Sequence, residues 1–279
     1  MKINLAKSAG FCFGVRRAIT IAMKTAGNDK QVYMLGDIVH NEEVVKQVRK
    51  RGIKKISRLG KGKGKILLIR AHGCANKTIK QAKNSGYTIV DATCPMVKEI
   101  HGLAKKAEEK GSRLIVIGDK KHDEVSGIVG QLNSPAIVID NLKHIPAALT
   151  KIKRANVVVQ STQNLGNALE IVNALRKIIP LVEFHNTICQ PTRIKQQEIK
   201  RMPKIFDIML IIGSKTSANT KRLFEISKSL NARSYWIDSD TQIKKEWFKN
   251  AETVGVSAGA STPESIIKKV VKKLNAICP

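Results

Sequence analysis

Short runs of apolar, strand-forming residues recur along the whole chain, and segments with helical periodicity separate them. The run at 66–69, Ile-Leu-Leu-Ile, is apolar at every position, and so is the run at 208–212. Such strands are typical of parallel sheets that helices cover on both faces. The other runs lie at 32–35, 87–90, 114–117, 136–139, 157–159, 235–237 and 254–256. This alternation predicts an α/β fold.

Three cysteines, Cys12, Cys94 and Cys189, stand about one third of the 279-residue chain apart. Each follows an apolar stretch and precedes a polar or helix-starting run. Grouping the strands by the nearest cysteine predicts three similar small α/β domains, 1–92, 93–187 and 188–279, with one thiol in each. Three such thiols can meet on a central axis.

Two of these cysteines precede a proline that suits the first turn of a helix, in Cys94-Pro and Cys189-Gln-Pro. A helix start favours the thiolate, which is the form that binds metal. A single cysteine is commonly a small buried hydrophobic residue, but three cysteines in similar local sequence patterns favour metal binding. The spacing does not separate a three-thiolate zinc site from an iron–sulfur cluster. Cys74 and Cys278 are less well placed to add a fourth ligand.

The chain is strongly basic, with 50 Lys and Arg against 22 Asp and Glu and a formal charge of +28. Such a charge also suits a nucleic-acid-binding protein with a structural metal. However, the lysines are spread over helix-like segments, and only 4% of residues are aromatic and able to stack on bases. We therefore expect no specific nucleic acid, but attraction for phosphorylated substrates and acidic proteins.

The chain has no apolar run of membrane-spanning length, and its start lacks the pattern of a signal peptide. The five cysteines are too few and too scattered for a disulfide framework. These features predict a cytoplasmic protein with no membrane partner.

Polar side chains gather just after the apolar runs, where parallel strands present their ligand-binding edge. Histidine, hydroxyl and amide groups there suit phosphate oxygens. The residues concerned are His40, His72, His122, Ser161, Thr162, Ser217, Asn219 and Ser261. Glu124, two residues after His122, is the carboxylate best placed for proton transfer near these tips.

Together these motifs resemble the 4-hydroxy-3-methylbut-2-enyl diphosphate reductase family of the methylerythritol phosphate route to isoprenoids, over nearly the whole chain. The segments that carry the resemblance are Gly-Phe-Cys-Phe-Gly-Val at 10–15, Val-His-Asn at 39–41, Ala-His-Gly at 71–73, Asp-Ala-Thr-Cys-Pro at 91–95, His-x-Glu-Val at 122–125, Gln-Ser-Thr at 160–162, Thr-Ile-Cys at 187–189, Gly-Ser-Lys-x-Ser-x-Asn at 213–219 and Ser-Ala-Gly-Ala-Ser-Thr-Pro at 257–263.

The resemblance implies three α/β domains in a trefoil around one 4Fe-4S cluster per chain, held by Cys12, Cys94 and Cys189. It implies a two-electron reductive dehydroxylation of (E)-4-hydroxy-3-methylbut-2-enyl diphosphate to isopentenyl and dimethylallyl diphosphate. The fourth iron lacks a protein ligand in this family and binds the substrate hydroxyl. A ferredoxin- or flavodoxin-type protein supplies the electrons.

Site roles follow from the same resemblance. The substrate-binding residues it implies are His40, His72, His122, Ser161, Thr162, Ser217, Ala218, Asn219 and Ser261, and the catalytic residues are Glu124, His122, Ser161 and Thr162. Ser161 stands where a threonine is expected, and because it keeps the hydroxyl we expect activity to be retained. Ala218 replaces a serine of some members, which leaves only its backbone to contact phosphate, and Asp123 stands where proline is frequent.

Overall fold

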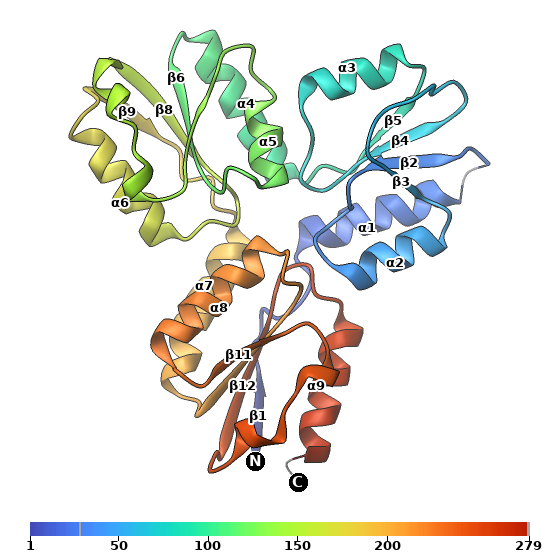
Figure 1. Cartoon of the computed structure of the whole chain (residues 1–279), viewed down its shortest axis with the longest axis vertical. Coiled ribbons are helices and arrows are strands. Elements are labelled where there is room, and N and C mark those ends of the chain that lie inside the picture. Colours follow the sequence, from blue (N-terminus) through green and yellow to red (C-terminus); the bar gives the residue numbers. More distant parts are fainter. Residues whose placement is uncertain (28, 278–279) are drawn as a thin grey trace. The chain divides into compact units, whose positions relative to one another are not determined.

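The computed structural model describes residues 1–27 and 29–277. Within these residues, three parallel sheets contain four strands each (Figure 1). The strands are β1 (Lys2–Leu5), β2 (Val32–Leu35), β3 (Lys54–Ile56), β4 (Ile66–Ile69), β5 (Thr88–Asp91), β6 (Arg113–Ile117), β7 (Ile137–Ile139), β8 (Arg154–Val159), β9 (Leu181–Phe184), β10 (Ile208–Ile212), β11 (Ser234–Ile237) and β12 (Thr253–Ala258). The predicted α/β class with three similar sheets is therefore confirmed.

Helices connect the strands of every sheet. They are α1 (Phe13–Ala26), α2 (Glu42–Lys50), α3 (Asn76–Asn84), α4 (Pro95–Glu109), α5 (Asp123–Val129), α6 (Leu165–Arg176), α7 (Gln190–Arg201), α8 (Ala218–Leu230) and α9 (Glu264–Ile277). Short 3-10 helices lie at Leu142–His144, Ala147–Lys151, Met202–Lys204, Asp240–Gln242 and Lys245–Phe248. Among the described residues, none of the helices has the length and apolar character needed to cross a membrane.

The three sheets share one strand order, β3-β2-β4-β5, β7-β6-β8-β9 and β11-β10-β12-β1. Each repeat runs through an inner strand, a helix, a short edge strand, a second inner strand, a helix and a second edge strand. In the third repeat, the last place is taken by β1 from the start of the chain. Its register with β12 pairs Lys2 with Thr253 and Leu5 with Val256.

This pairing departs from the predicted domain boundaries 1–92, 93–187 and 188–279 at one point, because strand β1 joins the sheet of the last segment rather than that of the first. Hydrophobic burial accounts for the difference, since Ile3 packs against the core cluster that contains Ile208 and Val254. The boundaries elsewhere in the chain stay a prediction.

Strands β10 and β6 show why the apolar runs are continuous. In β10, Ile208, Leu210 and Ile212 share a cluster with α9, whereas Met209 and Ile211 pack with α7 and α8. In the same way, β6 directs alternate residues toward α6 on one face and toward α4 and α5 on the other. Because successive side chains point to opposite faces, a strand covered on both faces must be apolar at every position.

The chain divides into two compact units. The end unit contains residues 1–16, 40–45 and the described residues from 190 onward, and therefore the sheet of β1, β12, β10 and β11. The middle unit contains the described residues of 17–39 and 46–189, with the other two sheets. The site residues of each unit are described separately below.

Candidate active site

Each of the three widely spaced cysteines lies between an edge strand and the helix that follows it, after β1, β5 and β9 and directly before α1, α4 and α7. Among the described residues, none of the three is in a disulfide, and each is partly exposed. In each case the backbone N–H donates to a carbonyl just beyond the second inner strand of the same sheet. The pairs are Cys12 with Ala260 at 3.2 Å, Cys94 with Ala71 at 2.9 Å and Cys189 with Ser161 at 3.1 Å.

These carbonyls belong to the loops that carry the predicted substrate residues. Ala71 precedes His72, Ala260 precedes Ser261, and Ser161 is itself one of the set. The loops after the first inner strands, β2, β6 and β10, carry His40, His122 and Ser217. Each repeat therefore places one thiol and two polar tips at equivalent positions, and this regularity is a stronger argument for a shared role than three isolated cysteines would be.

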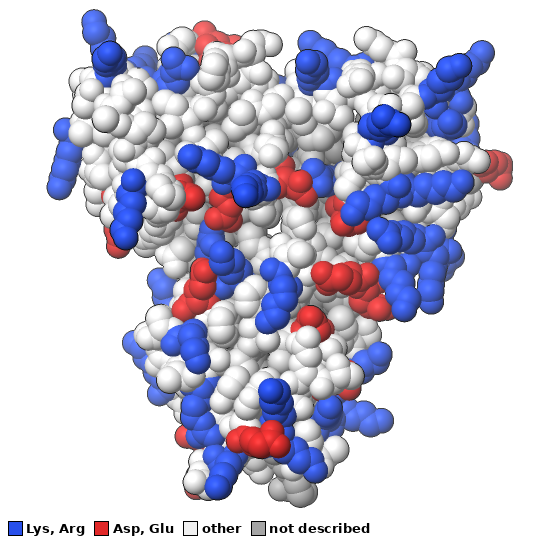
Figure 2. Space-filling view, viewed as in Figure 1, with Lys and Arg blue, Asp and Glu red and all other residues white. Residues whose placement is uncertain are grey.

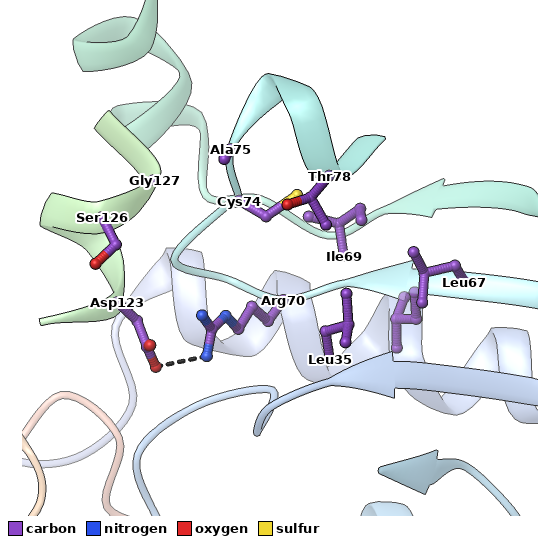
Figure 3. A pocket seen from close by; sticks show the side chains of 11 residues that line it. Leu35, Leu67, Ile69, Arg70, Cys74, Ala75, Thr78, Asp123, Ser126 and Gly127 are labelled. Carbon is purple, nitrogen blue, oxygen red and sulfur yellow. Dashed lines mark hydrogen bonds and ion pairs between the residues drawn. The ribbon is translucent and has the colours of Figure 1, made fainter. Parts of the chain in front are cut away.

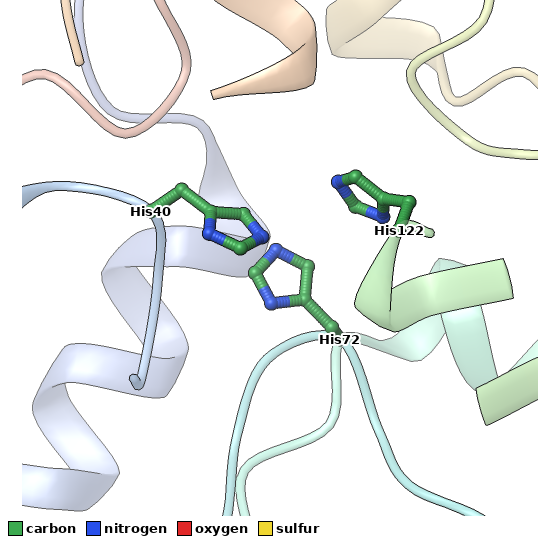
Figure 4. A group of neighbouring side chains, drawn as sticks. All are labelled: His40, His72 and His122. Carbon is green, nitrogen blue, oxygen red and sulfur yellow. The ribbon is translucent and has the colours of Figure 1, made fainter. Parts of the chain in front are cut away.

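In the middle unit, His72 and His122 face each other with their ring centroids 5.5 Å apart and their planes perpendicular (Figure 4). His122 caps helix α5, and its Nδ1 accepts a hydrogen bond from the backbone N–H of Glu124 at 3.1 Å. The neutral ring therefore carries its proton on Nε2, where it can donate to an anion. His40, also drawn in Figure 4, belongs to the end unit.

Glu124, the carboxylate of the predicted set, is deeply buried, with only 2% of its surface exposed. Its Oε1 accepts from the Ser161 N–H at 2.6 Å, and its Oε2 accepts from the Ser161 hydroxyl at 2.7 Å. Burial raises the pKa of Glu124 and outweighs these bonds, which lower it. A carboxyl group that keeps its proton to higher pH than usual suits a proton donor.

The raised pKa of Glu124 predicts a pH-dependent effect of Glu124→Gln on the stability of metal-free protein. Because the folded state binds this proton more tightly than the unfolded state, the stabilisation is complete below the unfolded pKa of glutamate and is lost as the pH rises through the folded pKa. The Tm advantage of the glutamine variant over wild type should therefore grow as the pH rises from the unfolded pKa of glutamate through neutral pH. A Tm difference that is constant across this range would show that burial does not penalise the Glu124 charge.

Thr162 is held by a residue that sequence reasoning missed. The fully buried Gln160 donates from Nε2 to the Thr162 hydroxyl at 2.9 Å, and its Oε1 accepts from the Asp119 N–H at 2.9 Å. Gln160 therefore links the loop after β8 to the loop after β6, which leads to His122. The Gln-Ser-Thr motif contained the signal, but Gln160 offers the site no reactive group of its own.

In the end unit, the first turn of helix α8 carries three of the predicted phosphate-binding residues. Ser217 caps the helix, its hydroxyl accepting from the Thr220 N–H at 3.3 Å, and Ala218 follows it in a buried position. Asn219 is only 4% exposed, yet neither its Oδ1 nor its Nδ2 has a hydrogen-bond partner among the described residues. Because a buried amide without partners is costly, Asn219 points to a polar ligand.

Two further predicted residues of the end unit are bonded to each other. The Ser261 hydroxyl donates to the backbone carbonyl of His40 at 2.9 Å. The residue before it, Ala260, accepts from the N–H of Cys12. One short loop after β12 therefore fixes the backbone positions of both His40 and Cys12.

Asp123 forms an ion pair with Arg70 at 2.5 Å, which gives this residue a structural role in the middle unit. Beside the pair lies a cavity of about 200 Å³ lined mainly by strand and helix residues, including Cys74 (Figure 3). Burial raises the pKa of Cys74 to about 11, so this thiol stays protonated at neutral pH. It is thus a poor metal ligand, as expected, and Cys278 lies outside the described residues.

A family model described as LytB protein matches residues 3–275. The chain belongs to this family. Curated relatives named 4-hydroxy-3-methylbut-2-enyl diphosphate reductase match along the full length. The protein of Pelobacter propionicus is 38% identical over 277 residues and covers 99% of both chains. That of Aquifex aeolicus is 37% identical and covers 99% of this chain and 96% of the relative.

Solved structures of LytB-type reductases agree with this assignment. One, of (E)-4-hydroxy-3-methyl-but-2-enyl diphosphate reductase, described as the terminal enzyme of the non-mevalonate pathway, is 36% identical, covers 99% of this chain and 100% of its own, and has a TM-score of 0.73. The Plasmodium falciparum E-1-hydroxy-2-methyl-but-2-enyl-4-diphosphate reductase is 27% identical, with a TM-score of 0.91 and coverage of 98% and 88%. The resemblance seen in the motifs is therefore confirmed at the level of family and fold.

Proposed function

We propose that this LytB-family chain reduces (E)-4-hydroxy-3-methylbut-2-enyl diphosphate to isopentenyl and dimethylallyl diphosphate. The observation that carries the proposal is an arrangement that recurs at Cys12, Cys94 and Cys189. The backbone N–H of each cysteine donates to a carbonyl in a loop that contains a predicted substrate residue. The full-length relatives with this activity in their names support the same reaction. Atoms balance when two electrons and two protons enter, the carbon–oxygen bond breaks and the hydroxyl leaves as water.

Cys12, Cys94 and Cys189 would hold a 4Fe-4S cluster. The donor set fits, because the three cysteines are not in disulfides within the described residues, are partly exposed and stand at the start of a helix, where negative charge is favoured. When bound, the cluster supplies the electrons and an iron that lacks a protein ligand. Zinc, the alternative that spacing left open, has no redox chemistry and could not itself pass the two electrons that this reaction needs.

The polar strand tips would hold the diphosphate. His40, His72 and His122 supply ring N–H donors, while Ser217 and Ser261 supply hydroxyls. Asn219 brings a buried amide that has no partner within the described residues, so a phosphate oxygen would satisfy its Nδ2. Ala218 can contribute only its backbone N–H, which lies in the first turn of α8.

Proton delivery would run through Glu124, with Ser161 and Thr162 beside it. The Ser161 hydroxyl and N–H hold both carboxyl oxygens of Glu124 in place. Its raised pKa keeps the proton available for the leaving hydroxyl. One proton leaves with that oxygen as water, and the other is added to carbon at either end of the allylic unit, which accounts for two isomeric products.

The electrons would come from a ferredoxin- or flavodoxin-type protein. Lys and Arg side chains are spread over the face seen in Figure 2, with fewer acidic groups between them. A positive surface favours encounter with an acidic partner.

The decisive experiment is anaerobic purification followed by metal and activity assays. We expect a brown protein with about four irons and matching sulfide per chain, which reduces the allylic diphosphate with a chemical electron donor. Colourless protein that stays inactive after reconstitution with iron and sulfide would contradict the proposal. Tight binding to a nucleic-acid column at physiological salt would instead favour a nucleic-acid-binding role.

Replacement of Asn219 by alanine should separate substrate binding from folding. Loss of an amide that meets only the ligand should raise the KM roughly 10- to 100-fold, while the free energy of unfolding without substrate stays the same or rises. Asn231, at the other end of α8, is the matched control, since its Nδ2 bonds to the carbonyl of Phe206 at 2.8 Å. Asn231→Ala should lower stability by about 1–2 kcal/mol without changing the KM. The opposite pattern would exclude Asn219 from the substrate site.

A further inference from the structure

Lys195, on helix α7 of the end unit, has a buried charged side chain that the proposed reaction does not use. Only 3% of its surface is exposed. Its Nζ donates to the backbone carbonyls of Ser8, Gly10 at 3.0 Å and Ala258 at 3.3 Å. An ammonium group has three N–H donors, so these three carbonyls can satisfy all of them.

Glu198, one turn further along α7, holds the same loop from its other side. Its carboxylate accepts from the N–H of Lys7 at 2.6 Å, from the N–H of Ser8 at 3.0 Å and from the Ser8 hydroxyl at 2.5 Å. Lys195 therefore binds the carbonyl of Ser8, and Glu198 binds its N–H and hydroxyl. Charge-assisted bonds of this kind are about twice as strong as neutral ones.

The segment held in this way leads directly to Cys12. After Ser8 the chain turns at Gly10, which has a φ of +89° that few other residues adopt, and reaches Cys12 two residues later. The third partner of Lys195, Ala258, ends strand β12 and precedes the loop with Ala260 and Ser261. Lys195 thus ties the cysteine loop to the loop of a predicted substrate residue.

Comparison of the three repeats shows that folding alone does not require a lysine here. The sixth residue after each of the three cysteines is buried, and it is Ala18 in α1, Ile100 in α4 and Lys195 in α7, exposed to 0%, 1% and 3%. The ninth residue is likewise apolar in α1 and α4, where it is Ile21 and Leu103, but it is Glu198 in α7. Because burying a charge is costly, an apolar residue would serve packing better.

We propose that Lys195 and Glu198 are positioning residues that fix the direction of the Cys12 thiol and its register with the Ser261 loop. This inference depends on the proposed function in one respect, because that function makes Cys12 a ligand of the cluster. The Cys94 loop has a different support, because the Arg17 guanidinium donates to the carbonyl of Thr93, the residue before Cys94, at 3.1 Å.

Thiol alkylation in metal-free, full-length protein tests the proposal without any cluster. The rates at Cys12 and Cys94 are measured in one sample by mass spectrometry, with Cys94 as the internal reference. In Lys195→Met and in Glu198→Gln, the Cys12 rate should rise about tenfold relative to Cys94, because the loop opens more often. Lys195→Arg, which keeps the charge and the donors, should restore most of the wild-type ratio.

Lys200→Met is the matched control, because Lys200 lies exposed on the same helix, and its ratio should equal that of wild type. An unchanged Cys12 to Cys94 ratio in both Lys195→Met and Glu198→Gln would overturn the proposal. If Lys195→Met does not fold, Glu198→Gln decides by itself, together with amide exchange at Ser8, which should be at least about tenfold faster in that variant.

Iron analysis after reconstitution separates this proposal from the proposed function. A wild-type protein that binds no iron, but whose variants show the selective rise at Cys12, would refute the cluster and leave the positioning role intact. Conversely, a wild-type protein with full iron and variants with an unchanged thiol ratio would refute the positioning role alone.

Discussion

Replacement of Cys94 by serine should abolish iron binding, with the iron content falling from about four per chain to near zero. A serine hydroxyl stays protonated at neutral pH and is a hard oxygen ligand, whereas iron–sulfur clusters require soft thiolates. Turnover should fall by more than about 100-fold. Even mutation of a residue that only hydrogen-bonds to a metal ligand typically lowers activity roughly 10- to 100-fold. Iron and sulfide assays and the visible absorption of the reconstituted protein measure the effect.

The fold should survive this change, because the anchoring bond at Cys94 is made by its backbone N–H and not by its thiol. Cys74→Ser is the matched control. Its thiol is buried and has a pKa of about 11, so the serine variant should keep its iron and its colour. Full iron content in Cys94→Ser, or equal loss in both variants, would contradict the assignment of Cys94 as a ligand.

The second large effect is expected for Glu124→Gln, which should keep the cluster and the KM but lower turnover by roughly 10²- to 10⁴-fold. The amide has nearly the shape of the carboxyl group, and its oxygen can still accept from the Ser161 N–H, so the loop should stay in place. The glutamine amide cannot release and regain a proton at accessible pH, so proton transfer to the leaving hydroxyl should fail. Steady-state kinetics with a chemical electron donor measure the loss.

Asp123→Asn is the control for this variant. Asp123 is the neighbouring carboxylate on α5, but it pairs with Arg70 and not with the Ser161 loop. We expect its turnover to remain within about twofold of wild type, because the asparagine keeps a side-chain oxygen that can still accept from Arg70 in this partly buried pair. Equal turnover in Glu124→Gln and wild type would remove Glu124 from the mechanism.

Local sequence predicted the inner strands well because their physical cause is local. The run at 66–69 is apolar at every position, since helices cover both faces of its sheet. Edge strands were harder to find. Strand β3 contains two exposed lysines, and the short apolar run of β9 is interrupted by Glu183, so both carry a weaker apolar signal than the inner strands.

The residues of the candidate site also fall into those that local sequence reveals and those that it does not. Cysteines and strand-tip histidines were visible because reactive side chains follow recognisable runs, and Cys94 indeed caps a helix whose first residue is Pro95. Gln160 stood in a motif but offered no reactive group, whereas Lys195 and Glu198 were not found because they act on backbone groups far away in the sequence. Glu198, for example, meets Ser8 across 190 residues. Such pairs depend on the tertiary fold, which no local pattern encodes.

The pairing of β1 with β12 has a consequence for the order in which the molecule matures during synthesis. Both sheets of the middle unit are complete once the chain has passed β9, at residues 181–184, so they can form while translation continues. Strand β1 precedes the middle unit in the chain, but its partner among the described strands, β12, follows some 250 residues later. Cys12 can therefore take up its native setting only after β12 has been made, so any cofactor that Cys12 helps to hold would be taken up only after that point.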